Sequence, residues 1–114
     1  MLFVEESAEA RGLIRTNIET LSQTGRARIY RRDATNLGEA GTLAPFGLAF
    51  ADPPYGHGLG EKALASALAG GWLLPGALAV LEESDKAEIA VPAGFQLAET
   101  RRIGDSALHF LTIL

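Results

Sequence analysis

Four predicted strands of the chain, of which all but the second are mostly apolar, are each followed by an acidic residue. They span residues 2–4, 27–32, 47–51 and 77–81, and the acids that follow them are Glu5-Glu6, Asp33, Asp52 and Glu82-Glu83. Apolar residues at helical spacing occupy residues 8–21 and 59–69, between the first and second segments and between the third and fourth. Strand, helix and strand with short links predict parallel strands, with helices on both faces of the sheet. Because ligands bind at the carboxyl ends of such strands, we expect several of these acids to line a binding edge.

The remaining elements complete an α/β fold. Ser7 is placed to cap the first helix, and Gly25 to end it in a left-handed conformation. Residues 36–43 predict a short helical turn, and residues 84–92 predict a loop. Residues 95–103 and 107–114 flank a Gly-Asp turn and predict a closing antiparallel hairpin. A mostly parallel sheet that ends in this hairpin is therefore expected, with residues 1–114 as a single domain.

Composition narrows the function. The chain has no cysteine, which excludes disulfides and thiolate metal sites, and two histidines are too few for a histidine metal cage. Its net charge of −4 argues against strong nucleic-acid binding by the surface as a whole. Most of the arginines nevertheless fall in the first third, where they could form a local basic face. No apolar run is long enough for a bilayer and no signal peptide is evident, so a cytoplasmic protein is expected.

The third apolar segment ends in Asp52-Pro53-Pro54-Tyr55. Two successive prolines remove two backbone donors, fix two φ angles and push the residue before each of them toward extended geometry. The result is a stiff corner that holds one carboxylate and one aromatic ring. The alternative is a plain stop between strand and loop, since Pro-Pro commonly marks loops.

Carboxylates at strand ends suit a nucleoside ligand. One can accept hydrogen bonds from both ribose hydroxyls, and a second can accept one from the exocyclic amine of adenine. The chain contains neither the glycine fingerprint of dinucleotide sites nor the phosphate loop of nucleoside-triphosphate sites. A nucleoside that lacks phosphate is therefore favoured.

Five segments together resemble the RsmD-type 16S ribosomal RNA guanine-N2 methyltransferases. They are Phe-Val-Glu-Glu-Ser at 3–7, Arg-Asp-Ala at 32–34, Ala-Asp-Pro-Pro-Tyr at 51–55, Gly-Trp-Leu at 71–73 and Val-Leu-Glu at 80–82. The resemblance covers essentially the whole chain. The Asp-Pro-Pro-Tyr tetrapeptide alone is typical of the wider group of amino-directed methyltransferases, which includes adenine-N6 enzymes.

The resemblance implies a class I enzyme that uses S-adenosylmethionine and acts on 16S rRNA or the small ribosomal subunit, without metal or membrane. By position, Glu5 would hold the cofactor's ribose, with Glu6 as the less favoured substitute. Asp33 would lie near the adenine amine, with the backbone of Ala34 beside it. The catalytic residues that the resemblance implies form the corner at 52–55. Asp52 and the Pro53 carbonyl would accept hydrogen bonds from the guanine amine, and Asp52 would also border the cofactor. Pro54 belongs to the same motif, and Tyr55 would stack on the base.

One part of the family pattern is not found in the sequence. Family members have a first strand followed by a glycine-rich loop that wraps the methionine part of the cofactor. In the class I fold that strand lies between the strand ending at Glu5 and the strand ending at Asp52. Its absence would leave two strand edges exposed, open to self-association, to a strand from another chain or to a rearranged sheet. The resemblance thus predicts a C-terminal portion of the enzyme that by itself binds cofactor poorly and is inactive.

Two other functions remain open. The first is an adenine-N6 or other amino methyltransferase acting on DNA or RNA. The second is a non-enzymatic domain that only binds a nucleotide or a partner. Trp72 is expected to serve packing, and Glu82 and Glu83 receive no assigned role.

Overall fold

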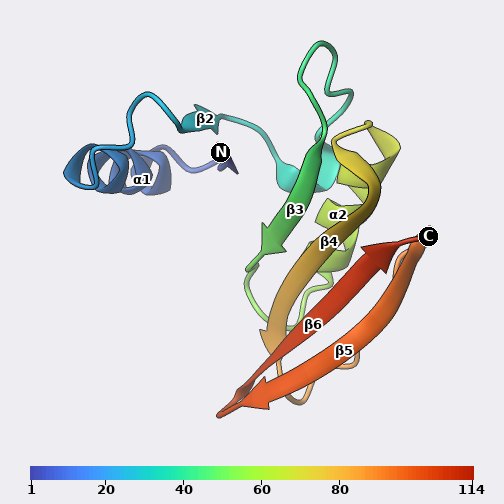
Figure 1. Cartoon of the computed structure of the whole chain (residues 1–114). Helices are drawn as coiled ribbons and strands as arrows, with labels where there is room; N and C mark the ends of the chain where they lie inside the picture. The colour runs from blue at the N-terminus through green and yellow to red at the C-terminus, as the bar shows by residue number, and fades with distance from the viewer.

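The computed structural model describes residues 1–114 and alternates strands with helices (Figure 1). The elements, in chain order, are β1 (Leu2–Val4), α1 (Ala8–Thr20), β2 (Arg28–Tyr30), the 3₁₀ helix η1 (Ala34–Asn36), β3 (Phe46–Ala51), α2 (Leu59–Ala69), β4 (Leu73–Ser84), β5 (Phe95–Ile103) and β6 (Ser106–Ile113). This is the α/β fold expected from the sequence.

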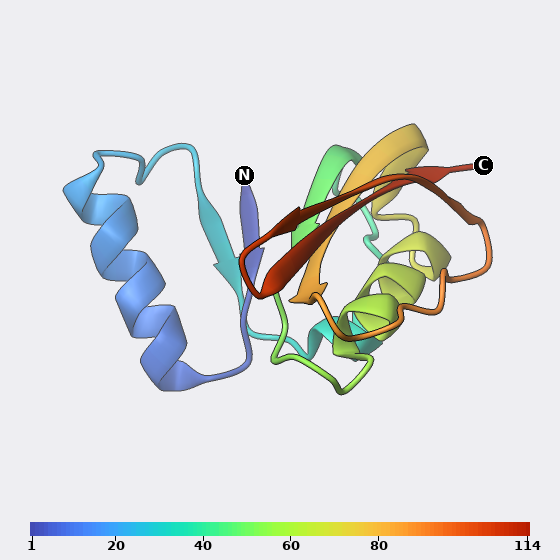
Figure 2. The same cartoon turned by 90° about the horizontal axis from the view of Figure 1, so that it is seen from below.

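The strands form two separate sheets. β1 and β2 pair in parallel as a two-stranded sheet, and the four-stranded sheet has the order β3-β4-β6-β5. β3 is parallel to β4, whereas β6 inserts between β4 and β5 and is antiparallel to both. β1 and β3 are not paired with each other, and the small sheet lies to one side of β3 (Figure 1). In the view of Figure 2 the turn between β5 and β6 overlaps β1. The sheet is therefore interrupted between β1 and β3, as expected for a chain without the first central strand of the class I fold.

Helix α1 begins as predicted but ends early. The Ser7 hydroxyl accepts a hydrogen bond from the Ala10 amide at 3.3 Å. The helix stops at Thr20 rather than running to Gly25, because Ser22 takes the left-handed conformation at φ 56°. Leu13 and Leu21, two of the apolar residues at helical spacing in this segment, are exposed. They are exposed because α1 flanks the small sheet, away from the four-stranded one (Figure 1).

Helix α2 packs on one face of the four-stranded sheet. Leu64 of α2 is buried against a cluster that also contains Ala79, Leu81, Phe95 and Leu111. The opposite face carries no helix (Figure 2). The side chains of Leu48 and Phe50 on β3 are therefore exposed, at 51% and 75%. The expectation of helices on both faces was thus wrong for this sheet.

Aromatic packing joins the two sheets where strand pairing does not. Trp72, 3% exposed, meets Tyr30 of β2 edge to face, with 6.3 Å between ring centroids. The Arg32 guanidinium lies over both rings, at 5.1 and 5.5 Å, and donates a hydrogen bond to the Leu37 carbonyl at 3.1 Å. The Trp72 indole donates one to the Gly38 carbonyl at 2.8 Å. Trp72 serves packing as predicted, and Arg32 is engaged in the same cluster.

Neither α1 nor α2 has the length and apolar character that a membrane-spanning helix requires.

Candidate functional site

The Asp-Pro-Pro-Tyr corner lies at the carboxyl end of β3, beside the end of β4. Ala51, the last residue of β3, pairs with Leu81 of β4. The next residues along these parallel strands are Asp52 and Glu82, so their side chains leave on the same face of the sheet. Burial first, then the neighbouring Glu82 carboxylate, which can accept a hydrogen bond from protonated Asp52 and repels its charge, raise the pKa of the Asp52 carboxyl. The two carboxyl groups therefore form an interacting pair.

The Tyr55 hydroxyl is held from two strands. Its oxygen lies 2.7 Å from Oε2 of Glu82 on β4 and 2.7 Å from Oγ of Ser106 on β6. Because the Glu82 carboxylate can only accept, the Tyr55 hydroxyl donates to Glu82, and the Ser106 hydroxyl donates to the Tyr55 oxygen. This pair of bonds fixes the polar end of the ring, and the side chain of Tyr55 stays 39% exposed.

The backbone after Tyr55 is fixed from the opposite face of β4. Glu83, 2% exposed, accepts hydrogen bonds at 2.9 Å from the amides of Gly56 and Ser84. Alternation along the strand sends Glu83 away from Glu82, so Glu83 anchors the loop and does not line the binding edge. The first turn of α2 then contacts the corner. A Cβ on Gly60 would collide with Leu81 and would lie 3.2 Å from Cγ of Pro53.

The two candidate cofactor acids lie at the ends of β1 and β2. Glu5 follows β1 and accepts a hydrogen bond from the Ser7 amide on Oε1 at 3.0 Å. Asp33 caps η1, and its Oδ1 accepts bonds from the amide and hydroxyl of Thr35 at 2.9 and 2.7 Å. These bonds, the hydroxyl first, lower the pKa of Asp33. Oε2 of Glu5 and Oδ2 of Asp33 accept no hydrogen bond within the chain, so both remain available to a ligand.

These free carboxylate oxygens have the chemistry that a nucleoside requires: they can accept from ribose hydroxyls and from an adenine amine. Ala34 is the first residue of η1, next to Asp33. Glu6 is exposed, and its carbonyl oxygen accepts a bond from Arg11 at 2.6 Å. That bond ties the backbone before α1 and does not involve the Glu6 carboxylate.

The structure thus groups the expected residues in two sets. Residues 52–55 gather on the four-stranded sheet, whereas Glu5 and Asp33 belong to the small sheet. Two members of the corner set, Glu82 and Ser106, had no role in the sequence-based prediction. The sequence places Glu82 at the end of a predicted strand, but its position beside Asp52 depends on the register of β3 against β4, which the sequence pattern does not specify. No local pattern indicates Ser106, because it comes from a hairpin 51 residues after Tyr55.

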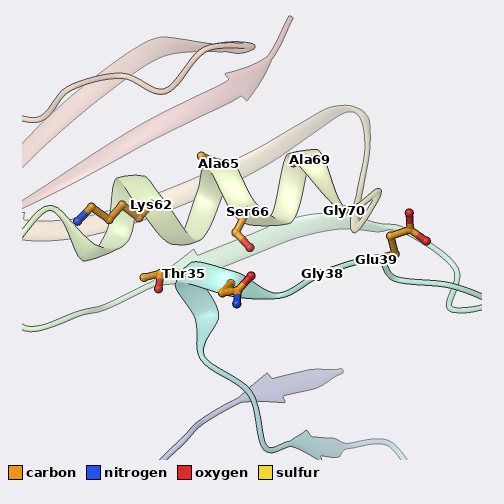
Figure 3. Close-up of a pocket in the computed structure, with 9 residues that line it drawn as sticks. Thr35, Gly38, Glu39, Lys62, Ala65, Ser66, Ala69 and Gly70 are labelled. Atoms are coloured by element: carbon orange, nitrogen blue, oxygen red, sulfur yellow. The ribbon is translucent and has the colours of Figure 1, made fainter.

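A hollow of about 600 Å³ lies elsewhere, between η1 and α2 (Figure 3). Its lining is mostly small or short side chains, and the Ser66 side chain points toward the η1 segment. The Ser66 hydroxyl accepts a bond from the Leu37 amide at 2.7 Å, so it is part of the packing between these elements. The hollow contains none of the candidate acids and no residue of the corner. We therefore place the candidate site at the strand ends.

Comparisons with solved structures identify the fold. A candidate methylase from Haemophilus influenzae superposes with a TM-score of 0.81 at 22% identity, over 99% of this chain and 71% of that one. A candidate methyltransferase from Escherichia coli gives 0.76 at 25% identity, over 98% and 61%. TrmN from Thermus thermophilus gives 0.79 at 24% identity, over 99% and 36%. The chain thus spans only part of the length of each. No curated protein matches it.

A family profile covers nearly the whole sequence. Residues 1–112 match the family described as "Conserved hypothetical protein 95". This match agrees with the resemblance found in the sequence. The strand order, the reversed strand β6 and the structural neighbours support the same family. The chain therefore belongs to the Conserved hypothetical protein 95 family of RsmD-type methyltransferases, and it has the class I methyltransferase fold without a strand between β1 and β3.

Proposed function

We propose that this chain carries the base-receiving half of an S-adenosylmethionine-dependent enzyme that methylates the exocyclic N2 amine of a guanine in 16S rRNA. The observation that carries the proposal is the corner itself. It presents an acceptor carboxylate, Asp52, and a partly exposed aromatic ring, Tyr55, at the same strand end. The small ribosomal subunit is the proposed partner and the cytoplasm the proposed location.

The corner suits an amine on a planar base. The Asp52 carboxylate and the Pro53 carbonyl can each accept a hydrogen bond from an exocyclic amine, which orients the nitrogen lone pair. The Tyr55 ring offers a face for stacking once the base leaves its helix or lies in a single-stranded region. Positioning of the nucleophile then supplies much of the rate enhancement.

Glu5 and Asp33 would hold the cofactor, through ribose hydroxyls and the adenine amine respectively. When bound, S-adenosylmethionine supplies a methyl group on a positively charged sulfur. The chain's own contribution is to align the amine and to accept the proton that the methylated nitrogen releases. Asp52 is the acceptor nearest that nitrogen in the proposed arrangement.

The test is a methyl-transfer assay on small ribosomal subunits with radiolabelled S-adenosylmethionine. It uses the 114-residue chain and, in parallel, the same chain preceded by the first strand and glycine-rich loop of a family member. We expect N2-methylguanosine from the extended protein and little product, with weak cofactor binding by calorimetry, from the chain alone.

Asp52→Ala in the extended protein should lower the rate about 10²-fold or more, since one preorganised acceptor is lost. Cofactor binding should change little if Asp52 acts mainly on the base. Glu88→Gln, in the exposed loop after β4, is the matched control. N6-methyladenosine as the product would point instead to an adenine enzyme. Cofactor binding without transfer to any RNA would point to a binding domain.

A further inference from the structure

We propose that Glu82 is a positioning residue of this site: it holds Tyr55 by the phenol oxygen and sets a second carboxyl group beside Asp52, so that Asp52 takes the proton from the methylated amine. The inference rests on the proposed function and adds to it a residue with a stated role. Glu82 would not touch the substrate. It would act through its two neighbours.

The position of Glu82 follows from the sheet. The register that pairs Ala51 with Leu81 sets Asp52 and Glu82 side by side at the ends of parallel strands. Two like charges on neighbouring residues are unfavourable unless one of them is stabilised or protonated. Glu82 has its own stabilisation, because the Tyr55 hydroxyl donates to its Oε2 at 2.7 Å. The repulsion between the two carboxylates therefore raises the pKa of Asp52, which binds a proton more readily.

The greater proton affinity of Asp52 suits the transfer of a proton from the methylated amine to its carboxylate. After methylation the amine nitrogen carries a positive charge and must lose one proton. The N–H bond breaks, an O–H bond forms on Asp52, the nitrogen becomes neutral and so does the carboxyl group. No further reactant is needed. A carboxylate beside a second negative charge is a stronger base than an isolated one, so Glu82 favours this step without taking part in it.

Ser106 completes the arrangement from β6. It donates to the Tyr55 oxygen at 2.7 Å, so the phenol is held by an acceptor on one side and a donor on the other. The bond from Ser106 lowers the pKa of Tyr55, whereas the bond to Glu82, burial and the charges of Glu82 and Asp52 raise it, with a net rise. The titratable groups that act on Tyr55 are thus Glu82 and Asp52, and the contact from β6 is uncharged.

The experiment is a pair of titrations on the full chain, without cofactor or RNA. Carbon-13 NMR follows the Asp52 carboxyl, and ultraviolet absorbance follows Tyr55, with Tyr55→Phe used to subtract the other tyrosine. Glu82→Gln keeps an oxygen acceptor for Tyr55 but removes the charge. We expect it to lower the pKa of both Asp52 and Tyr55.

Ser106→Ala should shift Tyr55 in the opposite direction, to higher pKa. Glu88→Gln, an exposed glutamate outside the cluster, should leave both titrations unchanged. Identical Asp52 titrations in the wild-type chain and the Glu82→Gln variant would overturn the proposal. Loss of folded structure in Glu82→Gln, seen by circular dichroism, would also count against it, because the role would then be purely structural.

Activity provides the separate readout. In the extended protein, Glu82→Gln should shift the acidic limb of the rate profile to lower pH, since Asp52 would then ionise more easily. An unmoved limb would contradict the assigned role. Absence of methyl transfer by the wild-type extended protein, with both titration shifts intact, would count against the proposed function and not against the coupling of Glu82 to its neighbours.

Discussion

Two aspartates of the candidate site should affect stability in opposite directions. The folded pKa of Asp52 is raised, so the native state holds its proton more tightly and stability falls as pH rises through that pKa. The folded pKa of Asp33 is lowered, so its contribution is present above the unfolded pKa and is lost as pH falls through the folded one.

Asp52→Asn should therefore raise the melting temperature at neutral pH and have little effect in acid. The gain should stay within about 1 kcal/mol, because Asp52 is solvent-exposed and water screens its charge. Asp33→Asn should lower the melting temperature at neutral pH, with the loss shrinking in acid. Thermal unfolding by circular dichroism at both pH values measures the two effects. Shifts of the same sign in the two variants would contradict this account.

Sequence reasoning located the corner residues but not their partners. Asp52 and Tyr55 stand in one short motif, and the chemistry of each residue type is evident locally. The bonds of Tyr55 to Glu82 and Ser106 cross 27 and 51 residues. They depend on strand register, which the apolar pattern does not specify to a single residue when both faces of a strand look alike.

At the scale of elements, α2 is tied to the corner through Gly60. Its missing side chain allows the first turn of α2 to lie against Pro53 and the fully buried Leu81. Gly60→Ala should overpack this contact and lower the unfolding free energy by about 1–3 kcal/mol. Displacement of the corner should also weaken the Tyr55–Glu82 bond.

Gly12→Ala in α1 is the matched control, because nothing lies within 4 Å of its Cβ position. There the change should stabilise the chain by up to about 1 kcal/mol, since alanine is the better helix former. Urea unfolding measures both variants. Equal effects of the two substitutions would show that the contact at Gly60 is loose.

The elements themselves were partly predictable. The bounds of α2 and β5 agree with the sequence pattern, since strong helical spacing and a Gly-Asp turn define them. The predicted end of α1 was wrong because Ser22, and not Gly25, adopts the left-handed conformation. The prediction that helices cover both faces of β3 was wrong. An apolar strand sequence is compatible with burial on both faces, but it does not show which face other elements cover.

At the scale of the whole molecule, the open face of β3 predicts self-association. Phe50 is 75% exposed beside an unpaired strand edge, a combination that favours contact between copies. Phe50→Lys should therefore reduce association measured by sedimentation velocity. Leu13→Lys, at an apolar position on α1 that is 64% exposed, should change it less. A wild-type chain that stays monomeric at all concentrations would refute the prediction.

The packing of Trp72 between the two sheets makes its fluorescence a probe of the contact between them. Trp72 is the only tryptophan, and it contacts Tyr30 and Arg32 of the small-sheet half of the chain. Its fluorescence should therefore respond when the small sheet separates from the four-stranded one. We expect a red shift at urea concentrations below those that abolish the far-ultraviolet dichroism. Coincident transitions would show instead that the two sheets separate and unfold as one unit.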